Sequence, residues 1–148
     1  MRITQWPHKL RRFGGLSSAD KWLFLRAVAW LAVARVMLIV LSFRRLSTRL
    51  SAGDNASSET PGQEYLQRVS FAMAAAASNV PWRSDCFPQA IAARMLLSRQ
   101  GYGSTIHLGF EKAAPDTVAG HAWLTCGDTV VTGGEQVGRY AEIHRLGE

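Results

Sequence analysis

The pattern of apolar and polar positions along the chain predicts helices first and strands afterwards. Residues 22–41 form a nearly unbroken apolar run that only Arg26 and Arg35 interrupt. Between residues 63 and 80 apolar side chains recur every three or four positions, and a similar stripe runs from about residue 84 to residue 100. This spacing is typical of amphipathic α-helices. We therefore expect three helices in this part of the chain.

The segments that follow show the two-residue period of β-strands. Apolar side chains alternate with small or polar ones in residues 104–110, and residues 121–126 and 129–132 flank the dipeptide Gly127-Asp128, which is typical of a hairpin turn. Helices followed by neighbouring strands, without β–α alternation, predict an α+β fold in which N-terminal helices precede a small antiparallel sheet. A chain of 148 residues is long enough for one domain with its own core.

Local signals at the helix ends divide this single domain into three parts. Ser17 or Ser18 can cap the first helix. Residues 60–63, Thr-Pro-Gly-Gln, have the pattern of a capping box with proline at the first helical position, and the proline at position 81 ends the second helix. We predict a basic helical lead-in at residues 1–50, a polar loop at 51–62 and the main body of the domain at 63–148.

Charge is distributed unevenly between the two ends of the chain. Residues 1–50 hold ten Lys and Arg against one acid, a net charge of +9, whereas residues 51–148 hold seven against ten acids, a net charge of −3. The basic part predicts contact with an acidic partner, nucleic acid or an anionic membrane, and a solvated basic face is the alternative. With 47% hydrophobic and 19% charged residues, the composition excludes collagen-like, coiled-coil and wholly disordered classes.

The apolar run at residues 22–41 is about as long as a bilayer is thick. Arg26 and Arg35 lie about 180° apart around a helix, so both faces would carry a charge that costs roughly 2.5–3.5 kcal/mol at the bilayer centre. A helix packed between other elements, or one lying on a membrane surface, fits better than a span. Because no small-residue cleavage site follows the run, we expect no secretory signal and a cytoplasmic location.

The residue that most suggests chemistry is Cys86, at the start of the third predicted helix. Unpaired N–H groups and the positive end of the helix dipole favour a thiolate there. A thiolate nucleophile needs a base, and His121 at the start of a strand is the candidate. The alternative is a small core residue. Two cysteines are too few for a disulfide framework or a thiolate zinc site, and we expect no metal.

Several other residues have weaker claims to a role. Trp82 and Trp123 could wall the cleft and bind substrate, with core packing as the alternative. Cys126, at a strand end, is expected to be a buried thiol, although a disulfide between the two cysteines stays open and a reducing cytosol disfavours it. His107 is expected at the surface or on the cleft rim, and His144 in solvent.

Two segments carry a resemblance to a known family. They read PWRSDCFPQAIAARMLLSRQGYGSTIHLGF at 81–110 and GHAWLTCGDTVVTGG at 120–134. Together with the lead-in KWLFLRAVAWLAVARVMLIV and the following FRRL, they resemble the B2 leader peptidase of lasso-peptide biosynthesis, a small member of the transglutaminase-like superfamily. The resemblance covers nearly the whole chain.

The resemblance implies a papain/transglutaminase-like catalytic core at residues 63–148 and a cysteine protease that removes the leader from a ribosomally made precursor. Cys86 would be the nucleophile and His121 the base. The implied partners are the lasso precursor, a leader-recognition protein supplied in trans and an ATP-dependent lasso cyclase. No cofactor and no nucleic acid are implied, and peripheral membrane contact is a possible addition.

The third catalytic group is where this chain departs from the family. The family often carries Asp about a dozen residues after the histidine, and here that region reads Thr132-Gly133-Gly134. Asp128, at the far end of the hairpin, would lie about 20 Å from His121. Glu135 is the nearest acid and is our prediction, whereas Asp85 more naturally caps the helix. A backbone carbonyl or a water is the alternative orienter.

Two further functions stay open beside leader cleavage. One is another thiol amidase or acyl-transfer enzyme on the same fold, which would act without a presenting partner. The other is a non-catalytic basic module that binds membrane or nucleic acid, in which the Cys86 thiol is part of the core. Salt-sensitive binding to anionic lipid or nucleic acid would indicate the latter.

Overall fold

The computed structural model describes residues 14–52, 59–114 and 117–146. Within these ranges the α-helices come first along the chain, as α2 (Ser18–Val40), α3 (Phe43–Ala52), α4 (Gln63–Asn79) and α5 (Cys86–Ser98). They are followed by the strands β1 (Thr105–Ala114), β2 (Thr117–Cys126) and β3 (Thr129–Thr132), the 3₁₀ helix η1 (Gly134–Arg139) and the strand β4 (Ala141–Leu146). The predicted α+β order is confirmed.

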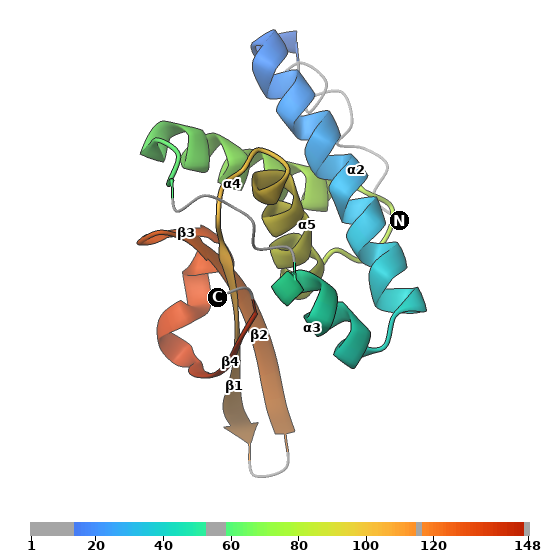
Figure 1. The fold of residues 1–148 in the computed structure, drawn as a ribbon, viewed down its shortest axis with the longest axis vertical. Coiled ribbons are helices and arrows are strands. Elements are labelled where there is room, and N and C mark those ends of the chain that lie inside the picture. The colour runs from blue at the N-terminus through green and yellow to red at the C-terminus, as the bar shows by residue number, and fades with distance from the viewer. Residues whose placement is uncertain (1–13, 53–58, 115–116, 147–148) are drawn as a thin grey trace.

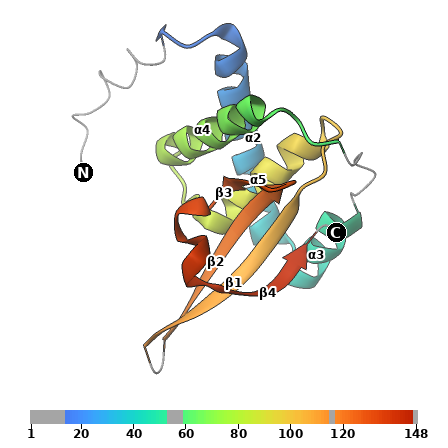
Figure 2. The ribbon, with the colours of Figure 1, turned by 90° about the vertical axis from the view of Figure 1, so that its left-hand side faces the viewer.

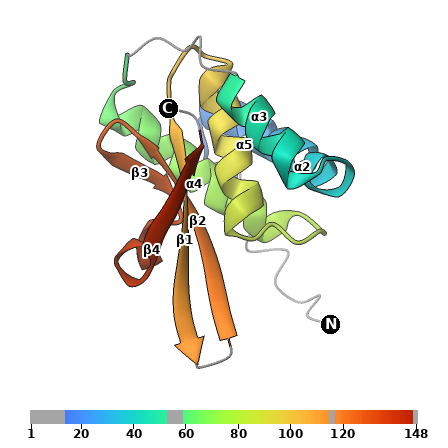
Figure 3. The same cartoon turned by 60° about the horizontal axis from the view of Figure 1, so that its bottom comes forward.

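The helices gather on one side of an antiparallel sheet whose strand order is β3-β2-β1-β4 (Figure 1). α5 packs between α2 and the sheet, where it meets β2 above all (Figure 3). α4 packs against α2, α5 and β3. At the other edge of the sheet, β4 runs toward α3 (Figure 2). α5 is therefore the central element, and its first residue, Cys86, lies where helices and sheet meet.

α2 shares one hydrophobic core with α4, α5 and the sheet. Its buried residues are spaced by three or four positions, so that one face of the helix packs inward. In α5, by contrast, most positions are buried, as expected of a helix covered on both sides. The largest fully buried side chains of this core are Leu31, Leu46, Leu66, Met73, Ile91, Leu96, Leu97, Ile106, Leu124 and Leu146.

The start of α2 agrees with the sequence. Ser17 is the N-cap, and its hydroxyl accepts a hydrogen bond of 3.2 Å from the Asp20 N–H. The Asp20 carboxylate accepts a hydrogen bond from the Ser17 hydroxyl and pairs with Arg68 of α4 at 2.7 Å. These hydrogen bonds, first from Ser17 and then from Arg68, hold the pKa of Asp20 below its ordinary value. The pair ties the first turn of α2 to α4.

Three features of the helical region differ from the prediction. The region holds four α-helices where three were predicted, because α3 follows α2 as a separate helix. α4 begins at Gln63 with Gly62 as N-cap, so the predicted capping box at Thr60 is wrong. The Thr60 side chain instead packs against the turn between β2 and β3, 3.2 Å from where a Cβ on Gly127 would stand. Helix α3 extends into the predicted loop, and the buried Arg94 guanidinium donates a 2.6 Å hydrogen bond to the Leu50 carbonyl near its end.

Candidate active site

Cys86 is half-buried at the first position of α5. Asp85 is the N-cap and has an extended backbone, but its carboxylate makes no hydrogen bond to the first turn. It pairs instead with the exposed Arg83, 3.3 Å from Nη2. The N–H groups at the start of α5 are therefore not capped by the Asp85 side chain. Together with the helix dipole they make the start of α5 electropositive, where the Cys86 side chain is attached.

His121 lies on β2, paired with Gly109 of β1. Its Nε2 is 2.8 Å from the carbonyl oxygen of Gly133. A carbonyl oxygen can only accept a hydrogen bond, so Nε2 must carry the hydrogen in this contact. In the neutral imidazole, Nδ1 then holds the lone pair. The Gly133 contact thus selects the tautomer in which Nδ1 is free to take a proton.

Only glycine fits at position 133. Gly133 has a φ of +74°, in the left-handed region. A Cβ there would stand 2.6 Å from the Ala122 carbonyl oxygen and 3.1 Å from His121 Nε2. The missing side chain lets the backbone turn away from β3 directly beside the imidazole. The structure therefore shows a backbone carbonyl, the alternative that the sequence left open, as the hydrogen-bond partner of His121.

Glu135, the predicted third residue, lies in the first turn of η1 and is exposed. It lines the same cleft as His121, but the hydrogen bond that orients His121 goes to Gly133. The hairpin explains the difference. A bulge between Leu124 and Thr125 shifts the pairing with β3 by one residue, and the chain then leaves the sheet after Thr132. The catalytic role of Glu135 stays a prediction.

The His121 ring stacks on two aromatic side chains. It stacks on Trp123 with a centroid distance of 6.0 Å and on Tyr140 with 4.9 Å. Trp123 in turn stacks on His107, the residue that it pairs with on β1. The centroids of these two rings are 5.3 Å apart, and their planes differ by 7°. Such contacts restrict rotation of the imidazole about its side-chain bonds. Tyr140 follows η1, and its part in the site was not foreseen from the sequence.

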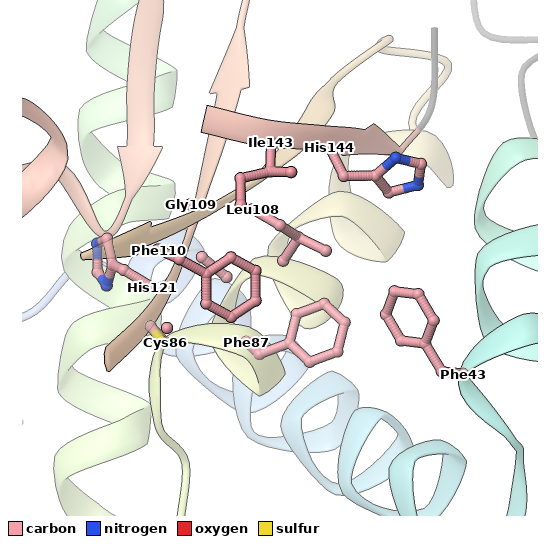
Figure 4. Close-up of a pocket in the computed structure, with 11 residues that line it drawn as sticks. Phe43, Cys86, Phe87, Leu108, Gly109, Phe110, His121, Ile143 and His144 are labelled. Carbon is pink, nitrogen blue, oxygen red and sulfur yellow. The ribbon is translucent and has the colours of Figure 1, made fainter. Parts of the chain in front are cut away.

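Two hollows meet at Cys86 and His121. The first, about 570 Å³, has walls that are largely apolar and aromatic, among them Phe43, Phe87 and Phe110 (Figure 4). Figure 4 places Cys86 and His121 at one end of this hollow and Phe43 and His144 at the other. We call it the apolar pocket; its other lining residues are Leu108, Gly109, Gly120, Ala122 and Ile143.

The second hollow, about 940 Å³, has a more polar lining. Its walls come from α4, the start of α5, β3 and η1, and they include Gln89, Thr132 and Tyr140. Cys86 and His121 line both hollows, so they lie at the junction of a two-sided cleft. An extended chain crossing that junction would present one bond to the thiol while its two sides meet different surroundings.

The tryptophans proposed as cleft walls do not line either hollow. Trp123 is only 4% exposed and lies behind His121 in the aromatic stack. Trp82 is half-buried and packs against the hydrophobic core. Both tryptophans therefore pack in or against the core, which was the alternative to a role as cleft walls. Trp123 therefore supports the imidazole instead of contacting the cleft.

His107 is buried, whereas the sequence predicted a position at the surface or on the cleft rim. Its Nε2 is 2.8 Å from the Thr125 hydroxyl, and its Nδ1 is 3.2 Å from a carboxylate oxygen of Glu142. A hydrogen bond from Arg145, with the nearby charge of His107, holds the pKa of Glu142 below its ordinary value. This group joins β1, β2 and β4 next to the aromatic stack of His121 and Trp123. His144, expected in solvent, is exposed but also lines the apolar pocket.

The second thiol is separate from this cleft. Cys126 is buried, and its sulfur donates a 3.2 Å hydrogen bond to the Gly103 carbonyl. Burial raises the pKa of Cys126, which disfavours its thiolate. Both cysteines are free, and no disulfide joins them. Within the part of the chain that the structure describes, no cluster of three or more His, Cys, Asp or Glu is placed to hold a metal ion.

Comparison with known families adds one independent line of evidence. A protein-family model described as "Transglutaminase-like superfamily" matches residues 28–145. The matched region starts within α2, ends within β4 and includes both Cys86 and His121. Searches of curated proteins and of solved structures gave no match.

Proposed function

The chain belongs to the transglutaminase-like superfamily, and from this premise we propose that it is a cysteine peptidase that removes the leader from a lasso-peptide precursor. Members of the superfamily are generally cysteine peptidases or transglutaminases. The observation that carries the proposal is the meeting of Cys86 and His121 in one cleft, with the histidine tautomer set by Gly133. The motifs around both residues support the finer assignment to leader cleavage.

The proposed reaction is acyl transfer through a thioester. His121 Nδ1 takes the proton of the Cys86 thiol, and the thiolate attacks the scissile carbonyl carbon. The Cys86 backbone N–H, at the open start of α5, can donate to the oxyanion that forms. Collapse of this intermediate breaks the C–N bond, and the leaving amine takes the proton from His121. A water then gives a proton to His121 and attacks the thioester carbonyl carbon. Collapse of this second intermediate breaks the C–S bond, releases the carboxylic acid and expels the Cys86 thiolate, which takes the proton back from His121.

The cleft supports a peptide substrate. Three large apolar side chains at the apolar pocket are partly exposed, namely Phe43 at 55%, Phe110 at 46% and Ile143 at 66%. Exposed apolar side chains gathered beside a catalytic pair are typical of a ligand-binding surface. We infer that apolar side chains of the precursor near the scissile bond bind there.

Specificity is proposed to come largely from presentation of the precursor. A leader-recognition protein supplied in trans would hold the leader and raise the effective concentration of the scissile bond at Cys86. The core peptide with its new N-terminal amine would then pass to an ATP-dependent lasso cyclase. Neither step requires a cofactor in this chain.

The test is cleavage of the precursor by the purified protein together with the leader-recognition protein, followed by mass spectrometry. Cys86→Ala and His121→Ala should each abolish the cut. Cys126→Ala is the matched control, because it removes the other thiol, which lies outside the cleft. It should retain activity as long as circular dichroism shows that it is folded.

Two results would overturn the proposal in different ways. Cleavage that persists in Cys86→Ala would remove the nucleophile, and with it the peptidase mechanism. Cleavage that depends on Cys86 but proceeds equally well on unrelated peptides, without the leader-recognition protein, would instead indicate a general thiol amidase or acyl-transfer enzyme.

A further inference from the structure

The outward face of α2 carries a continuous apolar stripe. Its members recur every three or four positions, so they share one side of the helix. The largest are highly exposed, with Trp22 at 68% and both Ile39 and Val40 at 70%. The full set of exposed positions is Trp22, Leu25, Ala29, Val33, Val36, Ile39 and Val40.

The opposite face of α2 is also apolar, but it is buried in the core through Leu23, Ala27, Leu31 and Ala34. By length and composition α2 is a helix that could cross a membrane, and a core helix can meet the same criteria. Spanning would turn the buried face toward lipid and separate α2 from α4 and α5. Packing of the core does not explain why the outward stripe is apolar, because the residues of the stripe are exposed and are not part of the core.

Positive charges border the stripe on both sides. At 100° per residue, Arg26 lies on one flank of the stripe, and Lys21 and Arg35 lie on the other. Asp20, the one acid in the sequence of α2, points to the core side and pairs with Arg68. The outward side of α2 is therefore an apolar stripe between cationic borders.

We propose that α2 lies along an anionic membrane surface, with this stripe at the boundary of headgroups and acyl chains. An exposed tryptophan at one end, aliphatic residues along the middle and cationic side chains at the edges are the features of a helix that lies in the interface plane. Arg26, Lys21 and Arg35 would reach anionic headgroups while the apolar side chains enter the lipid. This inference does not depend on the proposed peptidase activity.

The charges beside the stripe favour an anionic lipid surface over a second copy of the chain as the partner of this face. In a symmetric dimer through this face, the cationic borders of two α2 helices would meet and repel each other. The exposed Arg44, Arg45 and Arg49 of the next helix, α3, add to the same positive field. An anionic surface instead neutralises these charges, and each cation near it contributes about a fivefold gain in partition.

The experiment is co-sedimentation of the full-length protein with vesicles of phosphatidylcholine alone or with 30% phosphatidylglycerol. We expect binding to the anionic vesicles that weakens as salt rises, and a blue shift of tryptophan emission as Trp22 enters lipid. Ile39→Glu should reduce partition by about tenfold or more, because it removes a buried side chain and adds a repelled charge. Arg35→Gln should reduce it about fivefold.

Phe71→Glu is the matched control, since Phe71 is 67% exposed on α4, outside the stripe. It makes the same change of charge at a similarly exposed apolar residue and should leave partition within about twofold. Equal binding of wild type, Ile39→Glu and Phe71→Glu would overturn the proposal, as would lack of binding to anionic vesicles. A dimer in sedimentation velocity that Ile39→Glu dissociates, without lipid binding, would assign the face to a second copy instead.

Discussion

Replacing Gly133 by alanine tests whether its backbone carbonyl orients His121. The left-handed φ of +74° costs about 1–2 kcal/mol for an L-residue. The new Cβ would also stand 2.6 Å from the Ala122 carbonyl oxygen and 3.0 Å from the Trp123 Cβ. These atoms belong to β2 and cannot move alone, so the segment at Gly133 must shift. The shift removes the hydrogen bond to His121 as well, and the total loss of stability should be about 2–4 kcal/mol.

Substitutions at two other glycines distinguish the backbone strain from the Cβ clash as causes of the lost stability. Gly101 has a φ of +85° but open space around the Cβ position, so Gly101→Ala has the backbone strain without the clash. Gly138 has neither a positive φ nor a neighbour within 4 Å of the Cβ position. We expect Gly101→Ala to lose about 1–2 kcal/mol of stability in urea unfolding. Gly138→Ala should be close to wild type.

Activity and histidine tautomer are the decisive measurements. In Gly133→Ala the imidazole is no longer held, and kcat/KM for precursor cleavage should fall about 100-fold at a temperature where the protein is still folded. Nitrogen NMR of labelled histidine should show loss of the Nε2–H tautomer at His121. Both control variants should keep that tautomer and nearly full activity. If Gly133→Ala behaves like Gly101→Ala in all three measurements, the carbonyl does not orient His121.

Three further outcomes follow from the structure. Phe43→Ala should raise KM for the precursor about tenfold with little change in kcat, because it removes one wall of the apolar pocket, whereas Phe71→Ala should leave KM unchanged. Because the pKa of Glu142 is lowered in the folded protein, its ionised carboxylate stabilises the folded state at pH values above the ordinary carboxylate pKa. This stabilisation is lost as the pH falls through the lowered pKa. Glu142→Gln should therefore flatten the loss of stability seen in urea unfolding between about pH 5 and pH 3. A thiol reagent should label Cys86 in the folded protein and Cys126 only after unfolding, and equal labelling of both would contradict the burial of Cys126.

Local sequence signals predicted the parts of the fold that local interactions determine. Ser17 caps α2 as expected, the helix before Pro81 ends at Asn79, and Cys126 pairs with Thr129 across the Gly127-Asp128 turn. Each depends on residues within a few positions of one another. The same holds for the placement of Cys86 at the start of α5.

The features that were missed depend on contacts between distant segments. Thr60 lies outside α4 because it packs on the turn between β2 and β3. The partner of His121 is a backbone carbonyl, and a carbonyl has no residue type that a sequence could reveal. The signal that was available is the Gly133-Gly134 pair directly after a strand, which indicates a turn without side chains. His107 is buried because Glu142 of β4 reaches it, and β4 was not predicted.

The arrangement of supports behind His121 has a consequence for biosynthesis of the protein. The helix that carries the thiol emerges from the ribosome before every group that holds the imidazole, since Gly133, Tyr140 and Glu142 all lie farther along the chain. At translation rates of about 5–20 residues per second, Cys86 is made about 2–10 seconds before Gly133. During that interval a nascent chain has a thiol but no oriented base. Under the proposed mechanism, peptide-bond cleavage therefore begins only after β4 has joined the sheet.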